Sequence, residues 1–118
     1  VAYFKPLVDL LRMSELVRRQ LRTALEALVQ RDLDLVRQCA VTDATVDTMW
    51  KSLREELQGI MQQRPEVVVQ AVAFILVARY LERIADHAVN IAERVTYIET
   101  GHVETLVRRH SGDASEAT

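Results

Sequence analysis

Residues 66–101 read EVVVQAVAFILVARYLERIADHAVNIAERVTYIETG. Neither Gly nor Pro interrupts this stretch before Gly101, and Pro65 directly precedes it. Proline is favoured in the first turn of a helix and glycine just after the last turn. The stretch therefore predicts one long helix that ends at Gly101. Its apolar residues form two neighbouring stripes, which is typical of a helix that contacts two others in a bundle.

Two amphipathic helices are predicted before this one, over about residues 3–30 and 32–63. In each of them apolar residues recur at steps of three and four, with charged residues between. Asp32 is well placed to cap the second helix. The pattern predicts an all-α fold, a three-helix up-down-up bundle of long antiparallel helices that forms one domain over residues 1–101. The polar segment 102–118 is predicted to be a disordered tail.

Composition limits the classes of function. The chain has 118 residues, 49% of them hydrophobic, with a net charge of -2, so it has no excess positive charge with which to bind nucleic acid. Its single cysteine, Cys39, excludes an internal disulfide bond. No apolar run reaches the roughly 18 residues that a membrane span needs. We expect a cytoplasmic protein without direct membrane insertion.

Two pairs of acidic residues stand out because each falls within a predicted helix at a spacing of four. Asp43 and Asp47 lie on the second helix, and Glu82 and Asp86 lie on the third. Asp47 is 18 residues before Pro65 and Glu82 is 17 after it, so an antiparallel hairpin places the pairs at the same height. Like charges at this spacing repel, and moving them toward a core costs more unless a cation compensates. The four carboxylates are therefore predicted to form one oxygen-rich site.

A site built from carboxylates favours a hard divalent or trivalent cation such as Mg²⁺, Mn²⁺ or iron over Zn²⁺, which prefers nitrogen and sulfur ligands. Asn90 and Glu93 follow Asp86 on the same helix, and Arg79 precedes Glu82 by three residues. These three residues are candidates for additional ligands or for residues that orient the ligands.

The alternative is that Arg79, Arg83 and Arg94 neutralise the acids, which would make the chain a helical dimerisation module with a salt-bridged surface and no metal. No enzyme is predicted, because Cys39 lies in an apolar stripe and no glycine-rich phosphate loop is present. A metal-dependent phosphohydrolase would also need a base or nucleophile, and the sequence places none.

Residues 78–93, ARYLERIADHAVNIAE, closely resemble the signature of the PhoU family of bacterial phosphate-signalling regulators. The spacing of Asp43 and Asp47 resembles the other carboxylate motif of that family. Members usually contain two three-helix repeats with metal clusters at E/D-x-x-x-D motifs, and this chain resembles the C-terminal repeat.

The resemblance implies a negative regulator of the phosphate-starvation response and of phosphate uptake. Its partners would be the phosphate sensor histidine kinase and the ATPase of the phosphate ABC transporter. Such partners would recruit the chain to the inner face of the membrane.

The double stripe on the third helix also predicts self-association, as a homo-oligomer or by pairing with a missing N-terminal repeat. The residues expected on the exposed surface are Val68, Ile75 and Val89 beside Phe74, Leu81 and Ile91.

Overall fold

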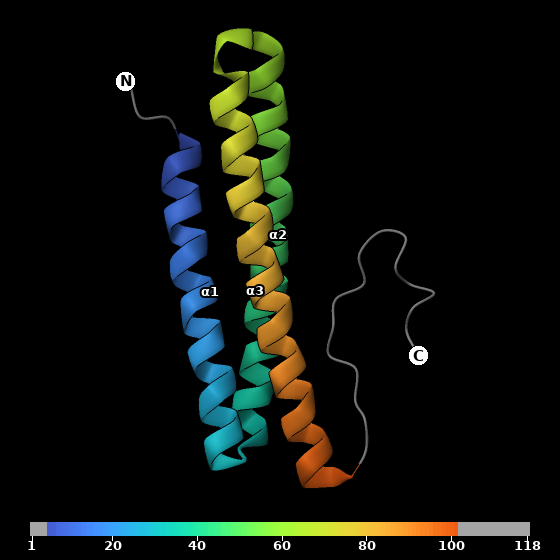
Figure 1. Cartoon of the computed structure of the whole chain (residues 1–118). Coiled ribbons are helices and arrows are strands. Elements are labelled where there is room, and N and C mark those ends of the chain that lie inside the picture. The colour runs from blue at the N-terminus through green and yellow to red at the C-terminus, as the bar shows by residue number, and fades with distance from the viewer. Residues whose placement is uncertain (1–4, 102–118) are drawn as a thin grey trace.

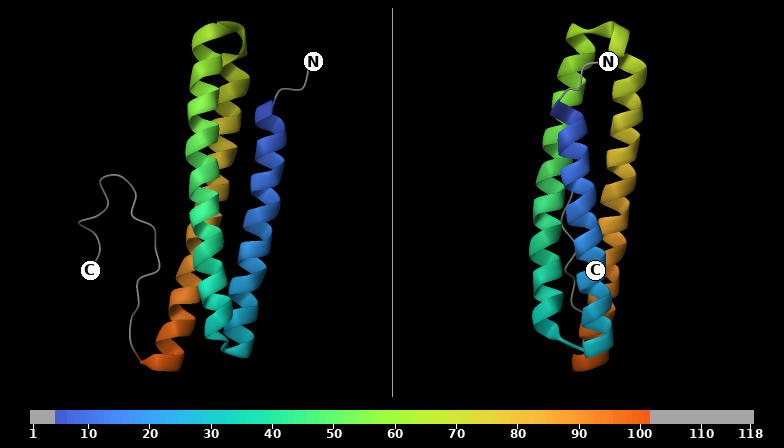
Figure 2. Two further views of the ribbon diagram at one scale, coloured as in Figure 1. Left: turned by 180° about the vertical axis from the view of Figure 1, so that it is seen from behind. Right: turned by 90° about the vertical axis from the view of Figure 1, so that its left-hand side faces the viewer.

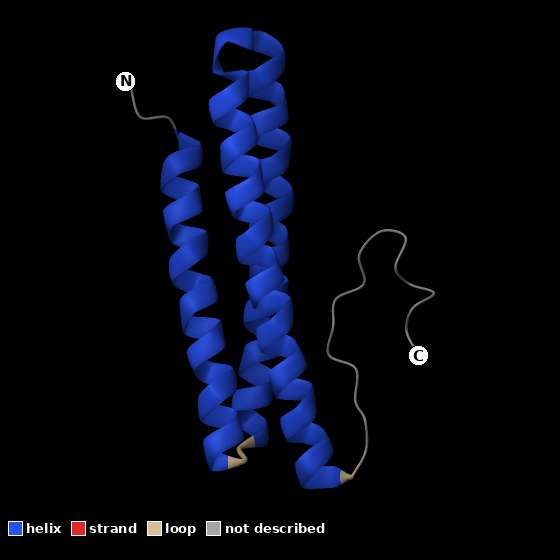
Figure 3. Cartoon of the chain, in the orientation of Figure 1, coloured by secondary structure: helices blue, strands red, loops and turns tan. Residues whose placement is uncertain are grey.

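The structure, a computed structural model, describes residues 5–101 of the chain. Its elements are α1 (Lys5–Gln30), α2 (Leu33–Gln63), the short 3-10 helix η1 (Pro65–Val67) and α3 (Val68–Thr100). The three long helices run antiparallel in sequence order, which confirms the predicted bundle (Figure 1; Figure 3). Across the described residues, none of the helices combines the length and apolar character that a bilayer span requires. The predicted tail at 102–118 and the first four residues lie outside the described residues.

The connection between α1 and α2 is very short. Asp32 accepts a hydrogen bond on Oδ1 from the backbone N–H of Asp34 at 2.8 Å, which is the predicted N-cap. Arg31, just before it, has a φ of 54° in the left-handed region. This conformation costs a non-glycine residue on the order of 1 kcal/mol, and it lets the chain reverse within two residues.

The connection between α2 and α3 differs from the sequence prediction by a few residues. The third helix begins at Val68, because Pro65 opens the 3-10 turn η1 instead of the α-helix itself. The backbone N–H of Val67 donates to the carbonyl of Arg64 at 3.0 Å, which closes this tighter turn. At the other end Gly101 has a φ of 75°, so the predicted glycine stop is confirmed.

Each long helix contacts both of the others, and α1 lies across the seam between α2 and α3 (Figure 2). Small residues line the inner side of α3, where alanines allow the helices to approach closely. The buried alanines of α3 are Ala71, Ala78, Ala85, Ala88 and Ala92.

The structure distinguishes the two apolar stripes of α3. Val89, which the sequence assigned to an exposed association surface, is 1% exposed, so that assignment is wrong. The stripe that contains Val89 also carries four of the buried alanines, Ala71, Ala78, Ala85 and Ala92, and it faces the core beyond Val68, which is 38% exposed. Exposed apolar residues instead lie on the neighbouring stripe, at Val77, Ile84 and Ile98.

Candidate functional site

A polar layer interrupts the core near the middle of the bundle. The core consists of two apolar clusters, of which one includes Val46 and the other Cys39. Asp43 lies between these two residues on α2, and Gln20 occupies the corresponding position on α1. Both polar side chains are 1% exposed. On α3, Ala85 belongs to the first cluster and Ala88 to the second, so Asp86 lies where one cluster ends and the other begins. Asp43 and Asp86 therefore lie at the boundary between the two clusters.

Gln20 connects α1 to the acidic residue of α2. Its Nε2 donates to the backbone carbonyl of Cys39 at 3.2 Å and to Oδ1 of Asp43 at 3.3 Å. Its Oε1 is buried and accepts no hydrogen bond from any described residue. A hydrogen bond to a charged group is worth about 1.5–3 kcal/mol, so Gln20 fixes the orientation of the Asp43 carboxylate.

The register of α2 against α3 follows from Cys39, whose Sγ lies 3.8 Å from the carbonyl oxygen of Ala88. Because the two helices are antiparallel, a step of four residues up α2 matches a step of four back along α3. Asp43 is therefore level with the interval between Glu82 and Asp86. The turn by itself predicts Asp43 level with residue 87, so the contact at Cys39 shifts the register by three residues, or about 4.5 Å.

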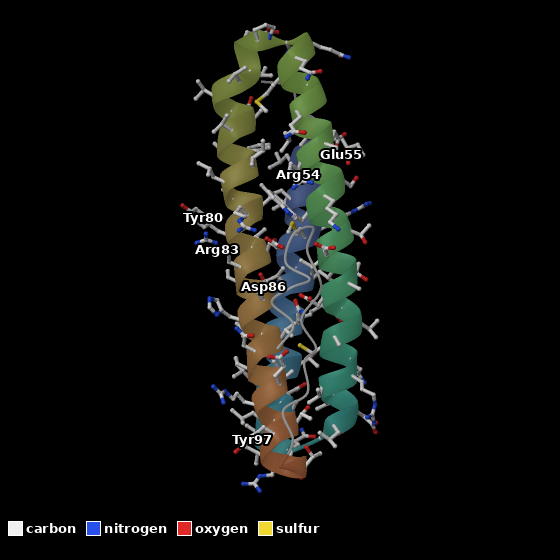
Figure 4. The ribbon with its side chains drawn as sticks, turned by 90° about the vertical axis from the view of Figure 1, so that its right-hand side faces the viewer. Arg54, Glu55, Tyr80, Arg83, Asp86 and Tyr97 are labelled. Atoms are coloured by element: carbon white, nitrogen blue, oxygen red, sulfur yellow. The ribbon has the colours of Figure 1, made fainter. Side chains whose placement is uncertain are left out.

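Two of the four predicted ligands already pair with a cation. Lys51 Nζ lies 3.1 Å from an Asp47 carboxylate oxygen, and Arg79 lies 2.5 Å from Oε1 of Glu82. Glu82 is completely buried, so Arg79 compensates a charge that would otherwise be costly. Arg83 points away from α2 instead (Figure 4). Arg79 is therefore the arginine of the salt-bridge alternative that neutralises Glu82.

The remaining predicted residues follow one flank of α3. Asp86 is half-buried and points toward α2 (Figure 4). One to two turns further on, Asn90 and Glu93 line a hollow of about 320 Å³ together with Arg94 and Tyr97. Asn90 and Glu93 thus border a separate polar depression below Asp86.

Within residues 5–101, no group of three or more His, Cys, Asp or Glu side chains is arranged so that it could hold a metal ion. The site shared by Asp43, Asp47, Glu82 and Asp86 therefore stays a prediction. The structure places these residues on facing helices, within about one helical turn of one another in height, and Asp47 and Glu82 pair with Lys51 and Arg79.

Sequence reasoning missed two residues of this region. Gln20 stands between Val17 and Ala24 in the apolar stripe of α1, and a polar residue at such a position signals a buried hydrogen bond. Lys51 follows Asp47 by four residues, which is the spacing of a helical ion pair. Both signals are visible in the sequence.

Cys39 is a buried packing residue, as predicted. Its side chain is 0% exposed, and burial raises the pKa of the thiol from 9.0 to about 11. The reactive thiolate is therefore scarce at neutral pH.

We expect Cys39 to react at least about 100-fold more slowly with a thiol reagent in the folded chain than in urea, because two pH units of pKa shift lower the thiolate fraction by that factor. Absorbance of the released chromophore measures the rate. Equal rates in the folded and unfolded chains would show that the thiol is accessible.

Comparison with known proteins identifies relatives of the chain. The PhoU domain family matches residues 10–95. A protein of Clostridium acetobutylicum named phosphate-specific transport system accessory protein PhoU homolog is 33% identical over 79% of this chain and 42% of its own length. The homolog from Pseudomonas putida is 36% identical over 80% of this chain and 37% of its own length.

Homolog 2 of Thermotoga maritima is 31% identical over 92% of this chain and 48% of its own length. The chain thus spans less than half the length of these curated relatives. No solved structure gave a significant match.

Proposed function

Because this chain belongs to the PhoU domain family, we propose that it regulates a phosphate-specific transport system as an accessory protein. The match over residues 10–95 carries this proposal, since it covers nearly the whole described bundle. We further propose that it acts negatively on phosphate uptake and on the phosphate-starvation response. Its partners would be the sensor histidine kinase and the transporter ATPase, at the inner face of the membrane. Its role would be regulatory and not catalytic.

The finer proposal is that Asp43, Asp47, Glu82 and Asp86 hold a hard cation, iron, Mn²⁺ or Mg²⁺. The donor set fits this chemistry, because carboxylate oxygens are the preferred ligands of such ions. Asp43 and Glu82 are buried acids, and buried charge favours the uptake of a compensating cation. A bound cation would neutralise the acids and join α2 to α3.

Metal binding must compete with cations of the chain itself. Lys51 holds Asp47, and Arg79 holds Glu82. Both basic side chains are about half exposed, so each can release its carboxylate and turn to solvent. Gln20 keeps its hydrogen bond to Asp43 in either case, which holds one carboxylate in place.

A second candidate function is a helical dimerisation module without metal. The ion pairs of Lys51 and Arg79 favour it, because they already compensate part of the acidic charge. The metal content of chain purified without chelator, before and after dialysis, distinguishes the two candidates.

Regulation is tested by expressing the chain in a bacterium that lacks its own PhoU-type gene. In phosphate-rich medium we expect the chain to lower a phosphate-starvation reporter toward the repressed level. The double variant Asp43→Asn with Asp86→Asn should fail to do so. Glu55→Gln is the matched control, because Glu55 is an exposed acid of α2 away from the proposed site.

A reporter that stays fully induced while the chain accumulates to normal levels would contradict the regulatory proposal. Since metal content is measured on the purified chain, a failure of the metal proposal is recognised separately.

A further inference from the structure

Gln20 is the polar residue among the buried side chains of α1. The other buried residues of this helix are apolar, namely Pro6, Leu10, Met13, Val17, Ala24 and Ala27. Only 1% of Gln20 is exposed, and its Oε1 accepts no hydrogen bond from any residue that the structure describes. A buried oxygen without a partner is unfavourable, so it requires a donor, a water molecule or a cation.

The nitrogen of the same amide is anchored at the acidic site. Nε2 donates to Oδ1 of Asp43 at 3.3 Å and to the carbonyl of Cys39 at 3.2 Å. Because Nε2 and Oε1 are bonded to one carbon atom, Oε1 lies at most roughly 6 Å from Oδ1 of Asp43. Metal–oxygen bonds of about 2.0–2.6 Å let one ion contact two oxygens up to roughly 5 Å apart. A small movement of the amide therefore brings Oε1 and Asp43 onto the same ion.

Gln20 also lies at the height of the acidic residues of α3. It contacts Cys39 and Asp43 of α2, and Cys39 is level with Ala88. Gln20 is therefore level with the turn of α3 from about residue 84 to residue 88. This turn contains Asp86, which points toward α2 (Figure 4).

An ion pair gives an independent measure of this height. Arg31 of α1 pairs with Glu99 of α3 at 3.7 Å, and the two helices run parallel. The offset of 68 positions sets Gln20 level with residue 88, about 3 Å from the height of Asp86. Both measures place Gln20 within about one helical turn of Asp86.

The acidic residues by themselves are a weak donor set. Residues 5–101 do not gather three His, Cys, Asp or Glu side chains that could hold an ion, so a cation site here needs an oxygen of another kind. The amide oxygen of Gln or Asn is an ordinary ligand of hard cations. It adds no negative charge, so it can lie beside the buried Asp43 without the repulsion that another carboxylate would bring.

We propose that Gln20 is the ligand that α1 contributes to the cation site, through Oε1, so that a bound cation joins all three helices. This inference rests on the metal proposal made above for α2 and α3. Nε2 keeps its bonds to Asp43 and Cys39, which leaves Oε1 for the ion. Loading of the site then also fastens α1 to the other two helices.

Titration with Mn²⁺ tests the role of the oxygen. Gln20→Met has a similar length but lacks this oxygen, so it should bind Mn²⁺ at least about tenfold more weakly. Gln20→Glu keeps an oxygen at the same reach and should bind at least as tightly as the unmodified chain. If Gln20 acted only by donating from Nε2, Gln20→Glu would bind as weakly as Gln20→Met, because a carboxylate does not donate.

Val17→Ala is the matched control on α1. Val17 is 2% exposed and lies three residues before Gln20, so this variant loosens the packing of the same helix without removing a polar atom. It should keep the Mn²⁺ affinity of the unmodified chain. Circular dichroism verifies the helix content of each variant.

Hydrogen exchange tests whether the cation reaches α1. Saturating Mn²⁺ should slow the exchange of α1 amides around Gln20 in the unmodified chain and in Val17→Ala. In Gln20→Met saturated with Mn²⁺, this protection should be confined to α2 and α3.

Equal Mn²⁺ affinity of Gln20→Met and the unmodified chain would overturn this inference alone, because metal binding itself would stand. An unmodified chain that binds no Mn²⁺ would overturn it together with the metal proposal. An equal loss of affinity in Val17→Ala would show that loosening of α1 is the cause. Weak binding by Gln20→Glu, or α1 exchange that does not change on loading, would likewise exclude Gln20 as a ligand.

Discussion

Asp86→Asn is expected to lower the affinity of the chain for Mn²⁺ at least about 100-fold while the helix content stays the same. The amide oxygen that replaces the carboxylate carries no charge and binds a hard cation weakly. Helicity is preserved because the substitution removes repulsion between Asp86 and Glu82, which are four residues apart on α3. Titration with Mn²⁺ and elemental analysis measure the affinity and the stoichiometry.

Glu55→Gln is the control for this experiment. Glu55 is an exposed acid on α2, so its loss changes the net charge equally but leaves the proposed site intact. If Asp86→Asn bound metal as well as the unmodified chain, Asp86 would not be a ligand. If neither protein bound metal, the salt-bridged module would be the correct interpretation.

Leu57→Ala should destabilise the chain by about 3 kcal/mol, which is a large part of the stability of a domain of this size. Leu57 is 0% exposed in the apolar cluster that also contains Trp50 and Ala71. Removing its branched end leaves a cavity that three long, straight helices cannot easily close. Urea unfolding followed by circular dichroism measures the loss.

Val41→Ala is the matched substitution on the exposed side of α2, where 70% of the residue is accessible. It should change the free energy of unfolding by less than about 0.5 kcal/mol. A similar cost for both variants would mean that Leu57 does not lie in the core that holds α2 in the bundle.

Local chemistry made much of the fold predictable. Asp32 has a side chain that caps a helix, Pro65 lacks a backbone N–H, and Gly101 adopts a positive φ without strain. Each effect acts within a few residues of the chain, so each helix end could be predicted within a few positions. The one shift, at Val68, arises because a 3-10 turn absorbs the reversal after Pro65.

The candidate site was predictable only in part. The spacing of Asp43 from Asp47, and of Glu82 from Asp86, is a property of the sequence, and their similar heights follow from the length of each helix after the turn. The hydrogen bond from Gln20 to Asp43 joins residues 23 positions apart, so it depends on how α1 packs against α2.

The sequence by itself determined three helices, their ends, and an acidic strip shared by the second and third, because these follow from periodicity and from residues within one or two turns. The tertiary structure alone decided which apolar stripe of α3 is buried. Two stripes about a quarter turn apart are both apolar, so the packing of α1 and α2 together selects between them. Val89 is buried in a cluster with residues of both helices, whereas Ile84 is 41% exposed. The inner stripe carries most of the small alanines that let three helices approach closely.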